Sequence, residues 1–130
     1  MDLSIEVSFA IASNSPRELA GFYGNLNHAE IFQGLNNNHW FILIRDSSKI
    51  EFYRPSKDLL CPKEGNSCAL CFKQQATDEP LKILTDWTNY LCELGGKVIT
   101  QARVEFFGAE IWVADPEDNE FLLVVTNMDR

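Results

Sequence analysis

The sequence predicts an α+β protein made of two similar modules, and three observations support this. In several short stretches apolar residues alternate with polar ones, which is typical of strands with one buried face. Two longer stretches repeat their apolar residues at the spacing of a helix with one buried stripe. The order strand, helix, strands occurs twice, over about 1–56 and 64–130, which indicates an internal duplication within a single domain of 130 residues.

The first module is expected to begin with a strand and a capped helix. Alternation over residues 3–11 predicts the strand. Residues 15–18 (Ser-Pro-Arg-Glu) have the form of a capping box with proline at the first helical position, so the helix is expected to begin there. A strand over 39–44 and its hairpin partner over 49–53 follow, joined by a turn that begins with Asp46.

The second module repeats this order. A helix is expected to open near Asp78, as its cap, and to close at Gly95-Gly96. The acidic segment 115–119 is interpreted as a turn rather than a calcium loop, because its spacing is not that of an EF-hand and Asp-Pro and Asp-Asn are turn residues. The strands of this module are expected over 67–73, 97–104, 109–114 and 120–125.

The negative charge of the chain indicates which classes of partner it is not expected to bind. It carries 11 Lys and Arg against 19 Asp and Glu, a formal charge of −8 with a pI near 4.6. Nucleic acids and anionic membrane surfaces select for basic proteins, so neither is expected as a partner. No apolar run reaches the length of a membrane span, and the first residues lack the pattern of a signal peptide, so a cytoplasmic location is expected.

The cysteines and histidines are expected to be structural. Cys68-Ala69-Leu70-Cys71 is a C-x-x-C pattern, but its flanks predict a strand, in which residues three apart point to opposite faces. Since free cysteines are among the most buried residue types, these two, Cys61 and Cys92 are predicted to be buried thiols. His28 and His39 are predicted to be surface or strand-end residues.

Three stretches carry a resemblance to a known family. They are Ser-Pro-Arg-Glu-Leu-Ala-Gly-Phe-Tyr at 15–23, Leu-Cys-Glu-Leu-Gly-Gly-Lys-Val at 91–98 and Ala-Asp-Pro-Glu-Asp-Asn-Glu-Phe-Leu at 114–122. In this order they resemble the vicinal oxygen chelate superfamily, the glyoxalase, bleomycin-resistance and extradiol dioxygenase group, with Asp118 in the usual glycine position. The resemblance implies two βαβββ modules whose mixed sheets curl around a cavity, and a homodimer.

The resemblance also implies where a metal would be held. Members with a metal place His, Gln or Glu at positions that fall here on Ser8, Glu51, Ala69 (or Ser67 in a shifted register) and Leu122. Only Glu51 can ligate a transition metal well, and a catalytic site normally needs three protein ligands. We therefore expect no metal and no other cofactor.

The same face is predicted to hold a small organic ligand. Glu51 is the candidate catalytic residue, as a general base or counter-charge; the alternative is an exposed glutamate paired with Lys49 or Lys73. Trp40 and Trp112 either line the cavity or belong to the core. The predicted ligand-binding residues are small, apolar or polar members of the cavity face: Ser8, Ala10, Tyr53, Cys71, Lys73, Leu122 and Val124.

These residues leave three functions open. The first is a metal-free protein that binds a small molecule, as bleomycin-resistance members do. The second is a lyase, isomerase or dioxygenase of the same superfamily, with an atypical metal site or with Glu51 as base. The third is a protein-interaction module, which the sequence does not distinguish from the other two.

Overall fold

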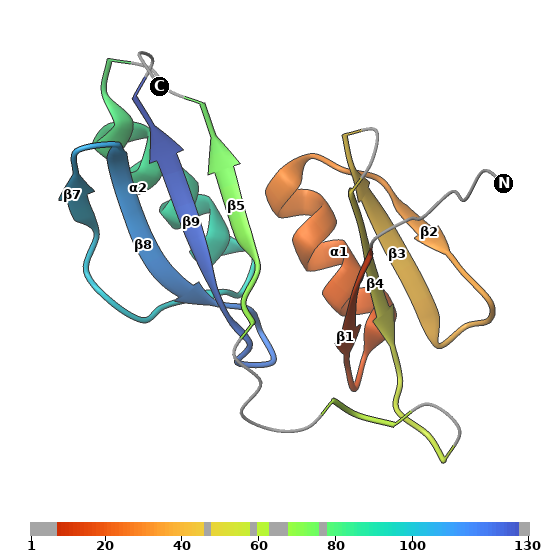
Figure 1. Cartoon of the computed structure of the whole chain (residues 1–130). Helices are drawn as coiled ribbons and strands as arrows, with labels where there is room; N and C mark the ends of the chain where they lie inside the picture. The colour runs from red at the N-terminus through yellow and green to blue at the C-terminus, as the bar shows by residue number, and fades with distance from the viewer. Residues whose placement is uncertain (1–7, 46–47, 58–59, 63–67, 76–77, 128–130) are drawn as a thin grey trace, which may run out of the picture. The chain divides into compact units, whose positions relative to one another are not determined.

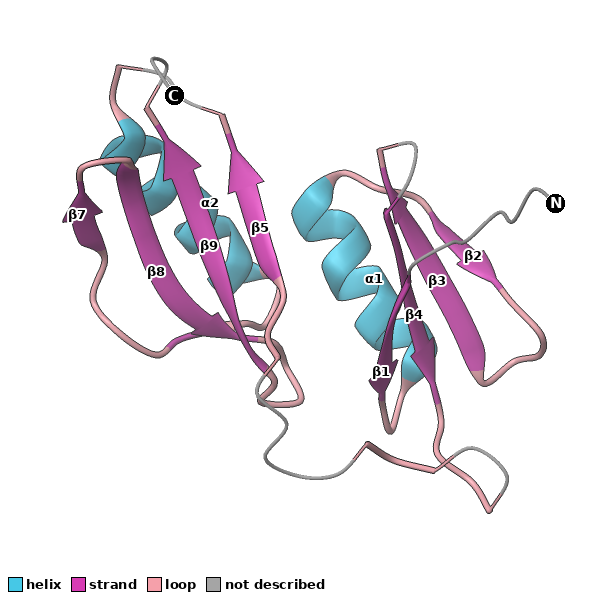
Figure 2. Cartoon of the chain, in the orientation of Figure 1, coloured by secondary structure: helices cyan, strands magenta, loops and turns pink. Residues whose placement is uncertain are grey.

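The chain forms two compact units, Met1–Asn66 and Ser67–Arg130. This computed structural model describes residues 8–45, 48–57, 60–62, 68–75 and 78–127. Each unit has one mixed sheet that is not closed into a barrel, with one helix against one of its faces (Figures 1 and 2). The predicted α+β fold is therefore confirmed.

The first unit has the order βαβββ. Its sheet is arranged β1-β4-β3-β2, with β1 parallel to β4 and the other pairs antiparallel. The three-residue strand β2 was not predicted, because so short a segment shows no alternation. Its elements are β1 (Ser8–Ala12), α1 (Pro16–Asn27), β2 (Ile31–Gln33), β3 (His39–Ile44) and β4 (Ser48–Tyr53). The predicted first half of β1 and the turn at Asp46 lie outside the described residues.

Helix α1 begins where the capping pattern predicts, but the predicted capping bond is wrong. Ser15 is the N-cap and Pro16 the first helical residue, yet within this described helix start the Ser15 side chain makes no capping hydrogen bond. Instead, the Ser15 amide donates to Oγ of the buried Ser13 (2.9 Å). At the other end His28 takes a left-handed conformation (φ 54°) and the Ala29 amide donates to the Gly24 carbonyl, which closes the helix.

The core of the first unit lies between α1 and one face of its sheet. Leu19, Tyr23 and Leu26 of the helix are buried against strand residues. The Tyr23 ring stacks on Phe52 with centroids 5.4 Å apart and the ring planes 23° apart. Because residues of a strand alternate between faces, the neighbours of Phe52 in β4 point to the opposite, open face.

The second unit has the same plan with one interruption. Its sheet is arranged β5-β9-β8-β6, and β7 also pairs with β8. The predicted strand over 97–104 is broken in two, because the Ile99 and Thr100 amides both donate to the Trp112 carbonyl (3.0 and 3.3 Å), which is bulge geometry. The elements are β5 (Cys71–Gln74), α2 (Pro80–Glu93), β6 (Lys97–Val98), β7 (Arg103–Glu105), β8 (Gly108–Ala114) and β9 (Glu120–Thr126).

The N-cap of helix α2 lies one residue later than predicted. Glu79, not Asp78, is the N-cap, because Pro80 with its fixed φ occupies the first helical position. The helix ends as expected: Gly95 has φ 101° and the Gly96 amide donates to the Leu91 carbonyl (2.9 Å).

The acidic segment after β8 is a turn, as predicted. Asp115 is fully buried, and its Oδ1 accepts hydrogen bonds from the amides of Glu117 (2.8 Å) and Asn119 (3.0 Å). Asp118, in the position where glycine was expected, has φ 69°, and aspartate is one of the few residues that tolerates this conformation. The carboxylate of Asp115 is thus used to hold the turn.

The prediction of buried thiols is wrong. All four cysteines are free and exposed. Cys71 lies on the open face of its strand, because the neighbouring Phe72 is the residue buried on the helix side. Cys92 lies on the outer side of α2, while Cys61 and Cys68 lie in segments between strands. Residue type alone therefore did not predict burial here.

Candidate functional site

The open face of the first sheet gathers the predicted residues of the first module. The parallel pairing of β1 with β4 sets Ser8 opposite Lys49, Ala10 opposite Glu51 and Ala12 opposite Tyr53. The antiparallel strand β3 places Phe41 on the other side of Glu51 and His39 opposite Tyr53. Since paired residues point to the same face, Ser8, Ala10, Glu51 and Tyr53 share one surface with His39 and Phe41.

Glu51 is the centre of a hydrogen-bonded cluster on this face. The Ser8 hydroxyl donates to Oε2 (2.7 Å), and His39 Nε2 lies 2.9 Å from Oε1. The side chain is 23% exposed, so it is shielded but reachable from solvent. The hydrogen bond from Ser8 lowers the pKa of Glu51, burial opposes this, and His39 and Lys49 add to the lowering. Glu51 is therefore a carboxylate at neutral pH.

The bonds of His39 define its tautomer. The Leu35 amide donates to Nδ1 (2.9 Å), so this nitrogen carries no hydrogen. A neutral imidazole then has its hydrogen on Nε2, which is the atom that faces Glu51. The loop holds the ring closely: a Cβ on Gly34 would lie only 2.2 Å from Nδ1. His39 thus donates to the carboxylate as a neutral group.

The role of His39 is the main feature that the sequence analysis missed. His39 does begin a strand, as predicted, but it is also a partner of Glu51. The signal was present in the predicted hairpin: pairing 39–44 with 49–53 places residues 39 and 51 diagonally on one face. The residues next to His39 in the sequence do not indicate this partner, because the contact forms across the hairpin.

An aromatic surface adjoins the cluster. The Phe41 ring stacks on Phe32, with centroids 5.4 Å apart and the planes at 25°. The ammonium of Lys49 lies 4.4 Å from the centre of the Phe41 ring and 3.8 Å from Oε1 of Glu51. The face therefore combines one carboxylate, one ammonium and two stacked rings.

Tyr53 lies on the same face, with its hydroxyl already engaged. It donates to the Leu60 carbonyl (2.7 Å). Burial, followed by the nearby Cys61, raises the pKa of Tyr53. Of the tryptophans, Trp40 lies on the helix side of the sheet, where the Arg17 guanidinium is 5.1 Å from its ring centre.

The open face of the second sheet gathers the remaining predicted residues. Cys71 pairs with Leu122 and Lys73 with Val124, so these four share a face. Trp112 pairs with Leu122 and lies half-buried on this face. Besides Lys73, the charged residues on this face include Glu110 and, from β7, Arg103 and Glu105. The side chains of Arg103 and Glu105 are 2.7 Å apart. Partial burial raises the pKa of the Cys71 thiol.

The metal positions implied by the resemblance do not fit a metal. The pair Cys71–Leu122 of the second sheet corresponds to the pair Ala10–Glu51 of the first. Ala69, two residues before Cys71, is therefore equivalent to Ser8. The alternative position, Ser67, lies outside the described residues. The four positions then hold one carboxylate, one hydroxyl that donates to it, and two side chains with no donor atom. Among the residues that the structure describes, no three His, Cys, Asp or Glu side chains form a group that could hold a metal ion. The absence of a metal stays a prediction.

His39 does not complete such a site either. Its Nδ1 accepts the Leu35 amide hydrogen, and its Nε2 therefore carries the hydrogen given to Glu51. A ring nitrogen must offer a free lone pair to bind a metal. Neither nitrogen of His39 does so in this arrangement.

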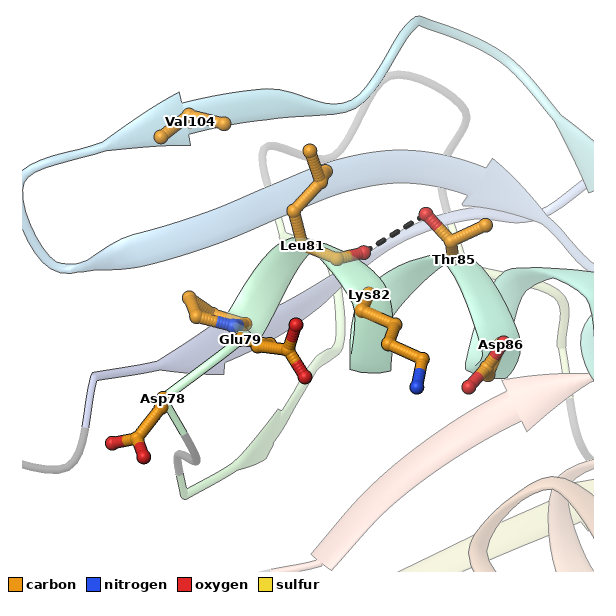
Figure 3. A pocket seen from close by; sticks show the side chains of 8 residues that line it. Asp78, Glu79, Leu81, Lys82, Thr85, Asp86 and Val104 are labelled. Carbon is orange, nitrogen blue, oxygen red and sulfur yellow. Dashed lines mark hydrogen bonds between the residues drawn. The ribbon is translucent and has the colours of Figure 1, made fainter.

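A separate hollow of about 550 Å³ lies at the beginning of α2 (Figure 3). In Figure 3 the Leu81 side chain points toward Val104 of β7, on the helix side of the second sheet. The Thr85 hydroxyl donates to the Leu81 carbonyl (2.8 Å) and is thus used within the helix. The hollow is lined by Asp78, Glu79, Pro80, Leu81, Lys82, Thr85, Asp86 and Val104, and it contains none of the predicted site residues.

The two βαβ-type units, each with one open sheet face, define a glyoxalase-like fold, and solved structures agree. The chain is similar to a glyoxalase/bleomycin resistance protein/dioxygenase family enzyme from Burkholderia phytofirmans PsJN (TM-score 0.71, 12% identity, covering 92% of this chain and 96% of that one). It is similar to a glyoxalase/bleomycin resistance protein from Albidiferax ferrireducens T118 (TM-score 0.67, 14% identity, 94% and 98% covered). It is also similar to the fosfomycin resistance protein FosX from Listeria monocytogenes (TM-score 0.65, 17% identity, 99% and 97% covered).

The fold that the resemblance implied is thus confirmed. No protein-family model and no curated protein sequence matches the chain. Among the described helices, none has the length and apolar character needed to cross a bilayer.

Proposed function

We propose that the chain binds a small, partly apolar organic molecule on the open face of its first sheet, with Glu51 as the anionic anchor and without a metal. The observation that carries this is the Ser8–Glu51–His39 cluster beside the Phe41 and Phe32 rings. A few oriented polar groups next to apolar area are what a small-molecule site requires. The names of the similar structures, which include two resistance proteins, support a small-molecule role.

Glu51 is better suited to be an anchor than a general base. A base works best when its pKa lies near the operating pH, and the pKa of Glu51 is lowered. Each carboxylate oxygen already accepts one hydrogen bond, which holds the group in one orientation. Each oxygen can still accept another bond from a ligand. The arrangement therefore favours binding over proton abstraction by Glu51.

The test is ligand-dependent thermal stabilisation of the wild-type protein and of Glu51→Gln. A ligand that binds only the folded state raises its Tm. Loss of the carboxylate is expected to weaken binding at least about tenfold, because hydrogen bonds to charged groups are the strong ones. Glu18→Gln is the matched control, since Glu18 is an exposed residue of α1 and its substitution removes the same charge as Glu51→Gln.

The outcomes separate the functions left open by the sequence. A compound whose Tm shift is lost in Glu51→Gln and kept in Glu18→Gln supports the proposal. A library that leaves the wild-type Tm unmoved at saturating concentration contradicts it and favours an interaction module. Turnover of a compound, with a rate that follows deprotonation of Glu51, favours the enzyme.

We also propose a homodimer and a cytoplasmic location. Within the described residues of the second sheet, β7 pairs with β8 on one side only, and Val104 and Phe106 beside this edge are 70% and 76% exposed. Open edges with apolar residues are commonly covered by a second copy. The charge of −8 supports the proposal that nucleic acid is not a partner. Light scattering at micromolar concentration is expected to give the mass of a dimer, and a monomer would contradict it.

A further inference from the structure

The ammonium of Lys49 occupies a position that also suits the cationic group of a ligand. It lies 4.4 Å from the centre of the Phe41 ring and 3.8 Å from Oε1 of Glu51. The face of an aromatic ring attracts cations, most strongly where water is partly excluded. A carboxylate on the adjoining strand attracts the same charge. Two independent features of the open face therefore select for positive charge at this one point.

Lys49 is held there only loosely. Its distance to Oε1 is longer than a hydrogen bond, and its side chain is 35% exposed. An ion pair at this distance between partly exposed side chains contributes little to stability, and a lysine side chain has many rotamers. The ammonium can thus move into solvent without breaking a strong interaction.

The remaining partners of Glu51 do not cancel its charge. The Ser8 hydroxyl is neutral, and His39 is neutral because its Nδ1 accepts the Leu35 amide hydrogen. When the Lys49 ammonium moves away, the face presents a fully charged carboxylate, oriented by two neutral donors, beside a bare ring. That combination is complementary to an organic cation and repels an anion.

We propose that the ligand carries an ammonium or guanidinium group, which displaces the ammonium of Lys49 and takes its place between Phe41 and Glu51. This rests on the proposed function and adds the chemical class of the ligand. Lys49 then acts as an internal competitor that fills the site in the absence of ligand. Removing it is expected to strengthen binding, whereas removing a residue that contacts the ligand weakens it.

The experiment uses calorimetric titration of the full chain with three probes of similar shape. They are benzylammonium, benzyl alcohol and benzoate, which differ in charge. In Lys49→Met, benzylammonium is expected to bind about five- to tenfold more tightly than in the wild type, the scale of one cation–π contact. Glu51→Gln and Phe41→Leu are expected to weaken it. Lys57→Met, at an exposed lysine of the same unit, makes the same charge change and is expected to leave the affinity nearly unchanged.

Each result decides the question. Unchanged or weaker benzylammonium binding in Lys49→Met overturns the proposal. Benzoate binding that depends on Lys49 overturns it too, because the lysine would then be an anchor for anions. Lys49→Gln is the second variant if Lys49→Met does not fold, and the same gain in affinity is expected. Glu51-dependent binding of benzyl alcohol, without a gain for benzylammonium, overturns this inference and leaves the proposed function standing. Failure of all three probes together with the library contradicts both.

Discussion

The two sheets have the same plan and carry different chemistry on their open faces. Counting from the paired residues, Ser8, Glu51 and Phe41 of the first sheet are equivalent to Ala69, Leu122 and Trp112 of the second. The first set includes a hydroxyl and a carboxylate joined by a 2.7 Å hydrogen bond. The second set is apolar. The two sheets thus share their pairing registers, while of these equivalent positions only Glu51 of the first sheet carries a charge.

The difference shows which residues the fold requires. On the helix side, Phe52 and Leu123 occupy equivalent positions, and both are fully buried and apolar. On the open face, the residues next to them in sequence are Glu51 and Leu122, which differ completely in polarity. Packing against a helix constrains one face, and the other face is free to vary with function.

The largest expected effect is a loss of stability, and it tests whether the cores on the helix side of the two sheets are alike. Phe52→Ala and Leu123→Ala each remove a fully buried side chain and leave a cavity. The free energy of unfolding is expected to fall by about 3–5 and about 2–5 kcal/mol respectively, measured by denaturant titration. A loss below about 1 kcal/mol in either variant would show that the two cores are not alike.

The next prediction concerns the loop that orients His39 in the first unit. Gly34→Ala places a Cβ within 2.2 Å of Nδ1, so the imidazole must shift away from the Leu35 amide. We expect a loss of about 1–3 kcal/mol in the free energy of unfolding, together with weaker ligand binding. The tautomer can be followed by the nitrogen chemical shifts of the ring.

Gly21→Ala is the control for this substitution. Gly21 lies within α1, and a Cβ there would meet nothing within 4 Å among the described atoms. Alanine in a helix interior is expected to be neutral or to stabilise by about 0.5–1 kcal/mol. If Gly34→Ala and Gly21→Ala lower the free energy of unfolding equally, the 34–38 loop does not hold the imidazole of His39.

The smallest expected effect is a dependence of stability on pH that belongs to the first sheet. The pKa of Glu51 is lower in the folded chain than its ordinary value, first because of the Ser8 hydroxyl. The carboxylate therefore stabilises the fold above its unfolded pKa of about 4.3, and this contribution is lost as the pH falls through the folded pKa. Denaturant titrations from pH 7 to pH 3 measure the difference between wild type and Glu51→Gln.

We expect that difference to be about 1 kcal/mol at pH 7 and to shrink toward the acid end. Ser8→Ala is expected to reduce it, because the main cause of the lowered pKa is removed. Leu122→Ala, at the equivalent position of the second sheet, has no ionisable group to lose and is expected to show a constant offset across this range. A pH-independent difference for Glu51→Gln would contradict the hydrogen-bonded carboxylate.

The sequence by itself determined the local elements and their order. Alternation, helical spacing and the Pro and Gly signals located α1, α2, β3, β4, β8 and β9 to within a few residues, because these patterns reflect which face of one element is buried. The resemblance to a known family, with alternation in agreement, indicated that the predicted site residues belong to a cavity face. Strand pairing then places Ser8, Ala10, Glu51 and Tyr53 on one sheet face and Cys71, Lys73, Leu122 and Val124 on another. The predicted helices and strands depend only on neighbours in the chain.

Only the tertiary structure decided the contacts between elements. The break between β6 and β7 follows from two amides sharing the Trp112 carbonyl on another strand, and the exposure of Cys71 follows from which side of β5 the helix α2 covers. The link from Leu35 through His39 to Glu51 needs a loop folded back on the ring and a hairpin in one register. Such contacts join residues distant in sequence, so their geometry is set by packing and pairing rather than by local periodicity.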